Sequence, residues 1–119
     1  MRFMMLVRAT EDTEAGRWPG RALAGELVAF NEEMIRAGVL LATDGLQPSA
    51  KGARVWVSNG RRVVVDGPFG EFRELVAGYW LIQVKSKDEA IEWASRIPFA
   101  DRNAIEVRQV VDASDLPAD

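Results

Sequence analysis

Apolar side chains alternate along several short segments of this chain in the manner of β-strands. Residues 2–8 are apolar on both faces, which is typical of a strand covered on both sides. Residues 39–42, 76–84 and 104–111 carry similar apolar runs and predict three further strands. Because both faces of these strands are apolar, the sequence predicts a sheet that needs cover on each side.

Two other segments show the spacing of amphipathic helices. From Leu23 to Met34 apolar residues recur every three or four positions, and Gly38 suits the left-handed residue that ends a helix. Ser86 to Glu89 is the sequence of a capping box, which opens a second helix that Pro98 stops. The predicted inward stripe of this second helix is Ala90, Ile91, Ala94 and Ile97. Residues 9–20, with Gly, Pro and polar residues, predict a loop.

Asn59-Gly60 is a strong signal for a two-residue hairpin turn, since both turn positions require φ > 0. It separates residues 54–58 from residues 61–65, which predict two more strands. A two-residue turn pairs three sets of residues across the hairpin: Val57 with Arg62, Trp56 with Val63, and Val55 with Val64. Each face of the hairpin then carries at least one apolar pair, so neither is clearly the solvent face.

The predicted order is strand, helix, strand, hairpin, strand, helix, strand. This order predicts an α+β fold, a ferredoxin-like βαββαβ sandwich with an inserted β-hairpin. Two helices can cover only one face of the sheet. A second copy of the chain is the simplest cover for the other face, so we expect a homodimer.

Composition excludes several kinds of chemistry. The 119 residues fit one domain with a real core, and they include no His and no Cys. A Ser-His-Asp triad, a thiol nucleophile and a zinc–thiolate site are therefore impossible. We expect no metal site and no cofactor. The net charge is −3 with scattered basic residues, which disfavours nucleic-acid binding. Apolar runs are too short to span a membrane, so a cytoplasmic protein is expected.

Candidate chemistry gathers where the second hairpin strand ends, at Asp66-Gly67-Pro68-Phe69. Asp66 could act as an acid or base or orient a ligand, or it could only fix the turn. Phe69 could line a pocket or fill the core. Asp44 is a second candidate catalytic carboxylate, with the alternative of a turn residue before Gly45. The remaining ligand-binding candidates are Gln47, Arg54 and Trp80, and Lys51 and Arg73 are further charges that could meet an anion.

These motifs together resemble the DGPF-domain branch of the YCII-related family. The resemblance runs in order over nearly the whole chain, so residues 1–116 are identified as one domain of this kind and residues 117–119 as a frayed tail. The matching segments are Asp44-Gly45-Leu46, Lys51-Gly52-Ala53-Arg54, Asp66-Gly67-Pro68-Phe69, Gly78-Tyr79-Trp80, Lys85-Ser86-Lys87-Asp88-Glu89-Ala90 and Ile105-Glu106-Val107-Arg108-Gln109.

The resemblance implies a ferredoxin-like fold, a dimer whose sheets face each other as in dimeric α/β barrels, and a cleft near Asp66. The wider superfamily includes small enzymes that act on aromatic, quinone-like or lactone compounds. Genes for DGPF proteins often lie near genes for extracytoplasmic-function sigma factors, which suggests a regulatory setting.

This chain departs from the family pattern at two places. Gln47 stands where relatives often carry His, and residues 97–103 form a shorter loop without the usual Cys and His. A His–Asp acid–base pair therefore cannot operate here. Two hypotheses follow. The first is a small-ligand-binding or regulatory protein without turnover. The alternative is a cofactor-free enzyme in which Asp66 catalyses isomerisation or elimination on a small aromatic or lactone-like substrate.

Overall fold

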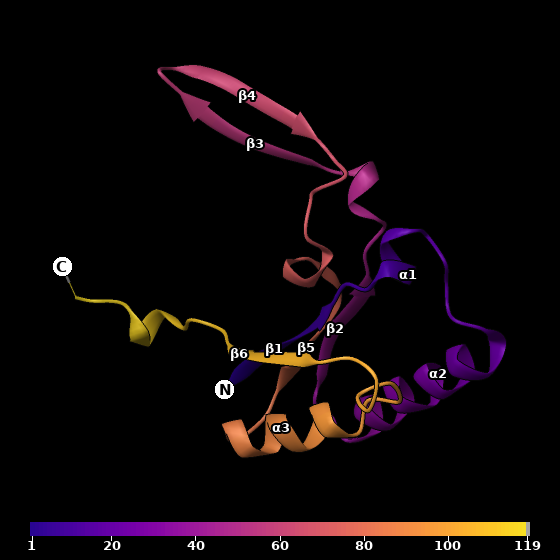
Figure 1. The fold of residues 1–119 in the computed structure, drawn as a ribbon. Coiled ribbons are helices and arrows are strands. Elements are labelled where there is room, and N and C mark those ends of the chain that lie inside the picture. The colour runs from indigo at the N-terminus through magenta and orange to yellow at the C-terminus, as the bar shows by residue number, and fades with distance from the viewer. Residues whose placement is uncertain (119) are drawn as a thin grey trace.

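The computed structural model describes residues 1–118 (Figure 1). Its helices and strands follow the predicted order, with one unpredicted helical turn, α1, inside the expected loop. In chain order they are β1 (Arg2–Arg8), α1 (Glu11–Glu14), α2 (Arg21–Arg36), β2 (Leu40–Gly45), β3 (Ala53–Ser58), β4 (Arg61–Asp66), β5 (Val76–Gln83), α3 (Lys87–Ser95) and β6 (Ile105–Gln109). Short 3₁₀ turns occur at Ser49–Lys51, Phe72–Glu74 and Ala113–Asp115. The tail predicted for 117–119 includes Asp119, which lies outside the described residues.

Four strands form one antiparallel sheet in the order β2-β5-β1-β6. Helices α2 and α3 lie on the same side of this sheet in Figure 1. The strand order and the single helical layer confirm the predicted α+β, ferredoxin-like fold. Strands β3 and β4 form a separate two-stranded sheet, which is the predicted insertion.

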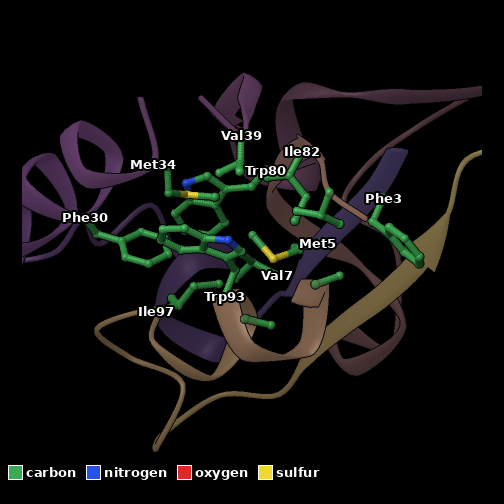
Figure 2. Packing of buried hydrophobic residues seen from close by; sticks show 13 residues of the cluster. Phe3, Met5, Val7, Phe30, Met34, Val39, Trp80, Ile82, Trp93 and Ile97 are labelled. Carbon is green, nitrogen blue, oxygen red and sulfur yellow. The ribbon is translucent and has the colours of Figure 1, made fainter. Parts of the chain in front are cut away.

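The core lies between the sheet and the two helices (Figure 2). Met5, Met34 and Ile82 are completely buried there. Three aromatic rings meet edge to face: the Phe30 ring centroid lies 5.8 Å from that of Trp80 and 6.1 Å from that of Trp93. Such edge-to-face pairs add stability beyond area burial, so this aromatic group fixes how both helices sit on the sheet.

Helix α3 turns a slightly different face to the core than the sequence predicts. Ala90, Ala94 and Ile97 are buried as expected, but the side chain of Ile91 is 46% exposed and that of Trp93 only 8%. The cap is also displaced. Ser86 Oγ accepts the Glu89 N–H at 3.1 Å, whereas the Glu89 carboxylate accepts the N–H of Lys85 at 2.9 Å rather than that of Ser86.

The opposite face of the sheet has no helix over it within the described chain. Its centre is apolar, because pairing sets Met4 opposite Leu81 and Leu6 opposite Tyr79 across β1 and β5. All four side chains are half-buried. The sequence prediction of two apolar sheet faces is therefore correct, and this second one, which we call the open face, is uncovered in the single chain.

The hairpin has the predicted register and turn. Val57 pairs with Arg62 and Val55 with Val64, and Asn59 and Gly60 adopt φ of 52° and 75°. Figure 1 shows the hairpin projecting well beyond the body of the molecule, on the side of the sheet away from α2 and α3. No helix among residues 1–118 has the length and apolar character that a membrane span requires.

Candidate functional site

A cavity of about 290 Å³ lies at the root of the hairpin, where α1, the Ser49–Lys51 turn and the segment after β4 meet. Its apolar wall is made by Leu46, Pro48, Phe69, Leu75 and Val76. Its polar wall is made by Glu14, Gln47, Ser49 and Lys51. A mostly apolar hollow with a few convergent polar groups is the usual form of a small-molecule site.

Helix α1 brings a carboxylate to this cavity. Thr10 and Thr13 cap each other at the start of the helix, with bonds of 2.8 and 3.1 Å between side chain and backbone. Glu14, at the end of the same turn, accepts the Ser49 N–H at 3.0 Å through Oε1 and the Ser49 hydroxyl through Oε2. Each carboxylate oxygen retains a lone pair that can accept a further hydrogen bond.

Ser49 also joins the cavity to the segment after the hairpin. Its Oγ accepts the backbone N–H of Phe69 at 3.0 Å, so the hydroxyl is oriented from both sides. Gly67 makes this approach possible, because a Cβ at that position would lie 1.8 Å from the Ser49 carbonyl oxygen. The glycine of the Asp-Gly-Pro-Phe segment is therefore required by close backbone contact. The guanidinium of Arg54 lies 4.0 Å from the centroid of the Phe69 ring, a favourable cation–π distance.

Comparison with known proteins gives the family. Residues 1–114 match the YCII-related domain. The chain belongs to the YCII-related family. Over 69 residues it is 36% identical to the uncharacterized protein R00369 of Rhizobium meliloti (strain 1021), an alignment that spans 58% of this chain and 56% of that protein. The match thus covers little more than half of the curated relative's length.

A solved structure shares the fold of this YCII-related chain. It is 5-chloro-2-hydroxyhydroquinone dehydrochlorinase from Burkholderia phenoliruptrix AC1100, in complex with 2,5-dihydroxybenzoquinone. The two chains superpose with a TM-score of 0.52 at 13% identity, over 96% of this chain and 97% of the other. At this level of identity the likeness shows a common fold.

Two of the site residues predicted from the sequence of this YCII-related chain, Gln47 and Phe69, line the cavity, and Arg54 contacts the Phe69 ring. Asp66 does not line it. Asp66 is the last residue of β4, is paired with Ala53 and is exposed to solvent. Within the described chain its carboxylate neither faces this cavity nor bonds to its own turn. Of the charges considered for an anion, Lys51 lines the cavity, whereas Arg73 is exposed outside it.

Asp44 and Trp80 lie elsewhere in the YCII-related chain. Asp44 is exposed on β2 and accepts a hydrogen bond from the Tyr79 hydroxyl at 3.3 Å. Partial desolvation and then the Asp44 carboxylate raise the pKa of Tyr79 above its ordinary value of 10.0. Trp80 is buried on the helix side of the sheet, and its Nε1–H donates to Asn31 Oδ1 at 2.7 Å. The sequence predicts that Trp80 contacts a ligand together with Phe69. This prediction is wrong, because strand β5 directs the Trp80 side chain into the core and away from the cavity.

Glu14 is the functional candidate that the sequence did not indicate. The Thr10–Thr13 cap and the acidic residues after it are a local signal for a helical turn. Nothing in that signal shows that the turn packs against Ser49, which lies 35 positions further along the chain. The carboxylate at the cavity could be found only from the fold.

A second cavity is the other possible ligand site. It has a volume of about 570 Å³ and lies between the α1–α2 connection and residues 99–103, with Trp18, Leu27 and Phe99 in its wall. At that second cavity the carboxylate of Asp12 is paired with the guanidinium of Arg17 at 2.8 Å. Among residues 1–118, no cluster of three or more Asp or Glu side chains is arranged to hold a metal ion. The oriented Glu14 makes the first cavity the better candidate.

Proposed function

We propose that this YCII-related protein binds a small hydroxylated ring compound in the cavity between Glu14 and Phe69. The observation that carries the proposal is the Glu14 carboxylate, which Ser49 fixes through two hydrogen bonds at the edge of an apolar hollow. A ligand hydroxyl could donate to this carboxylate while the ring lies against Phe69 and Leu75. Such charge-assisted hydrogen bonds are roughly twice as strong as neutral ones.

Lys51 gives the ligand a second expected feature. Lys51 is among the residues that line the same cavity, and an ammonium group donates to oxygen acceptors. A ring with a hydroxyl at one position and a carbonyl or phenolate oxygen at another would meet Glu14 and Lys51 together. The neighbour of like fold is a dehydrochlorinase that binds 2,5-dihydroxybenzoquinone, a ligand of this class, which supports the choice of compounds to test.

Catalysis is the alternative function, and Glu14 is the residue that favours it. A carboxylate held beside a bound hydroxyl can accept its proton as a general base, which would assist isomerisation or the departure of a leaving group. The sequence predicts Asp66 for this role, but Asp66 is exposed outside the cavity, so Glu14 is the stronger candidate. Ser49 would act as a positioning residue, since its hydroxyl already bonds to Glu14 and to Phe69.

Calorimetric titration with hydroquinone, 2,5-dihydroxybenzoquinone and an unhydroxylated control such as anisole tests the proposal. We expect binding of the hydroxylated rings only, and Glu14→Gln should weaken it about tenfold or more because a hydrogen bond to a charged group is lost. Glu11→Gln, on the same helix turn but outside the cavity, and Asp66→Asn are matched controls that should bind normally.

The two candidate functions separate in one further assay. Wild-type protein incubated with chlorinated hydroquinones should release chloride if Glu14 is catalytic, and Glu14→Gln should abolish this release. Binding without turnover would favour the non-catalytic function. Absence of binding to any hydroxylated ring, or equal binding by wild type and Glu14→Gln, would overturn the proposal.

A further inference from the structure

One arginine lies against the wall of the candidate site with its charge unpaired in the described chain. The Arg54 guanidinium lies 4.0 Å from the centroid of the Phe69 ring, the shortest of three arginine–ring contacts among residues 1–118. The other two arginines, Arg73 and Arg96, each also pair with a glutamate carboxylate. Within the same described range no carboxylate lies at ion-pair distance from Arg54. Its positive charge therefore acts on the Phe69 ring without a neutralising neighbour.

Backbone hydrogen bonds at the root of the hairpin hold Arg54 and Phe69 together. Arg54 is the second residue of β3, the strand that enters the hairpin. The N–H of Gly67, just after β4, donates to the Gly52 carbonyl, just before β3, at 3.0 Å. The N–H of Phe69 donates to Ser49 Oγ, also at 3.0 Å. These two bonds join the segments that enter and leave the hairpin, so the contact between Arg54 and the ring does not depend on the two side chains alone.

The Phe69 ring separates Arg54 from the cavity. Phe69 is half-buried and lines the cavity, whereas Arg54 is exposed to solvent and does not line it. A guanidinium 4.0 Å from the centroid covers one face of the ring, so the cavity meets the rest of the ring. Stacked aromatic rings have centroids about 4.5 Å or more apart. A ligand ring packed on Phe69 in this way would lie roughly 8–9 Å from the guanidinium.

We propose that Arg54 acts through Phe69 as a charge-selecting residue, so that the cavity binds a hydroxylated ring more tightly once the ring has lost one proton to water. This inference rests on the proposed ring-binding function and deepens it. One carboxylate, Glu14, and one ammonium group, Lys51, line the cavity, and the Arg54 guanidinium adds a second positive charge behind Phe69. A singly ionised ring suits this arrangement, because its remaining hydroxyl donates to Glu14 while its negative oxygen lies in the field of two cations. The ligand class is therefore acidic hydroxylated rings, such as nitrocatechols and hydroxyquinones.

The distance sets the expected size of the effect. Two unit charges roughly 8–9 Å apart, at an effective dielectric constant between about 20 and 80, shift the pKa of a ligand by about 0.4 to 1.4. Because Arg54 is exposed, solvent and salt bring the effect toward the lower end of this range. A lowering of the ligand pKa by about 0.4 corresponds to a preference of about 2.5-fold for the ionised ring over the neutral one.

A pH titration of bound 4-nitrocatechol at low ionic strength tests the inference, because the neutral and ionised forms of this ligand absorb at different wavelengths. The chain contains no His and no Cys, so no side chain with an ordinary pKa titrates between about pH 5 and 8. Arg54→Gln should raise the pKa of the bound ligand by about 0.4 or more. Arg54→Lys keeps the charge without the planar stacking group and should restore most of the difference. Arg61→Gln, at the turn end of the same hairpin, is the matched control and should leave the ligand pKa unchanged.

The outcomes separate this inference from the proposed function. If Arg54→Gln weakens both ligand forms equally and leaves the bound-ligand pKa unchanged, Arg54 only supports the Phe69 ring and the inference is wrong. Binding of hydroquinone by a wild-type protein that does not bind 4-nitrocatechol would also contradict it. In either case a weakening of ring binding by Glu14→Gln would still support the proposed function. If wild-type protein binds no hydroxylated ring at all, the proposed function is overturned and the role of Arg54 is overturned with it.

Discussion

At the scale of residues, the sequence identified the neighbourhood of the candidate site better than its chemistry. The sequence predicts Phe69 and Gln47 as ligand-binding residues, and both line the cavity. Gly67 belongs to the Asp-Gly-Pro-Phe segment that the sequence points to, and its close contact with the Ser49 carbonyl explains why this position is a glycine. The carboxylate at the cavity is not the one that the sequence predicts. Asp66 is exposed at the end of β4, whereas Glu14 lines the cavity and comes from a segment that the sequence predicts as a loop. A contact across 35 positions depends on tertiary packing, which spacing along the chain does not encode.

The pair of Asp44 and Tyr79 allows a test of local electrostatics. Tyr79 is the chain's single tyrosine, so the ultraviolet absorbance of its phenolate reports its pKa without interference. Asp44→Asn should lower that pKa toward 10.0, because the carboxylate that opposes the phenolate charge is removed. Asp66→Asn is the control and should leave the titration unchanged. Equal titration curves for wild type and Asp44→Asn would show that Asp44 does not act on the phenol.

The raised pKa of Tyr79 also sets a direction for stability at alkaline pH. Above pH 10.0 the unfolded chain loses the phenol proton before the native chain does, so the free energy of unfolding falls as pH rises through this range. Below pH 10.0 the phenol is neutral in both states and contributes no pH dependence. Tyr79→Phe should therefore lose less stability than wild type when denaturant melts at pH 9 and pH 11 are compared.

At the scale of elements, helix α3 buries Trp93 in place of Ile91, which the sequence predicts for its inward stripe. Ala90, Ala94 and Ile97 define the buried direction. At 100° per residue, Trp93 lies about 67° from the mean of these three positions and Ile91 about 93° from it. Both side chains are large and apolar, so the spacing of apolar residues alone is compatible with either of them on the buried face. Trp93 is the buried one because it lies closer to the buried direction of the helix and packs against the Phe30 ring on the facing helix.

Truncating these two side chains should have very different effects. Trp93→Ala removes a ring packed against Phe30 and should cost roughly 3–5 kcal/mol of unfolding free energy. Ile91→Ala removes a side chain that is half exposed and should cost less than about 1 kcal/mol. Denaturant melts at a single protein concentration measure both, since any dimerisation makes stability depend on concentration. Similar losses for the two variants would contradict the orientation of α3.

At the scale of the whole molecule, the ferredoxin-like fold could be predicted because each element carried a distinct signal. Apolar runs and alternating apolar residues predict the strands, apolar residues at helical spacing predict α2 and α3, and Asn59-Gly60 predicts the hairpin turn. The sequence also indicated that both faces of the sheet are apolar, as the structure confirms for the open face. It could not indicate where the hairpin lies, because a register fixes the pairing within a hairpin and leaves its direction from the body undetermined.

The uncovered sheet leads to the last prediction, that the protein is a homodimer held in part by its open face. Sedimentation at micromolar concentration should give about twice 13.2 kDa. Leu81→Arg should yield a monomer, because Leu81 lies at the apolar centre of that face opposite Met4. Arginine is chosen since its aliphatic stem can lie along the sheet of a folded monomer while its charge opposes a second apolar face. Ile91→Arg, on the outer side of α3, is the control and should remain dimeric. A wild-type monomer with normal stability, or a Leu81→Arg dimer of unchanged affinity, would contradict an interface at the open face.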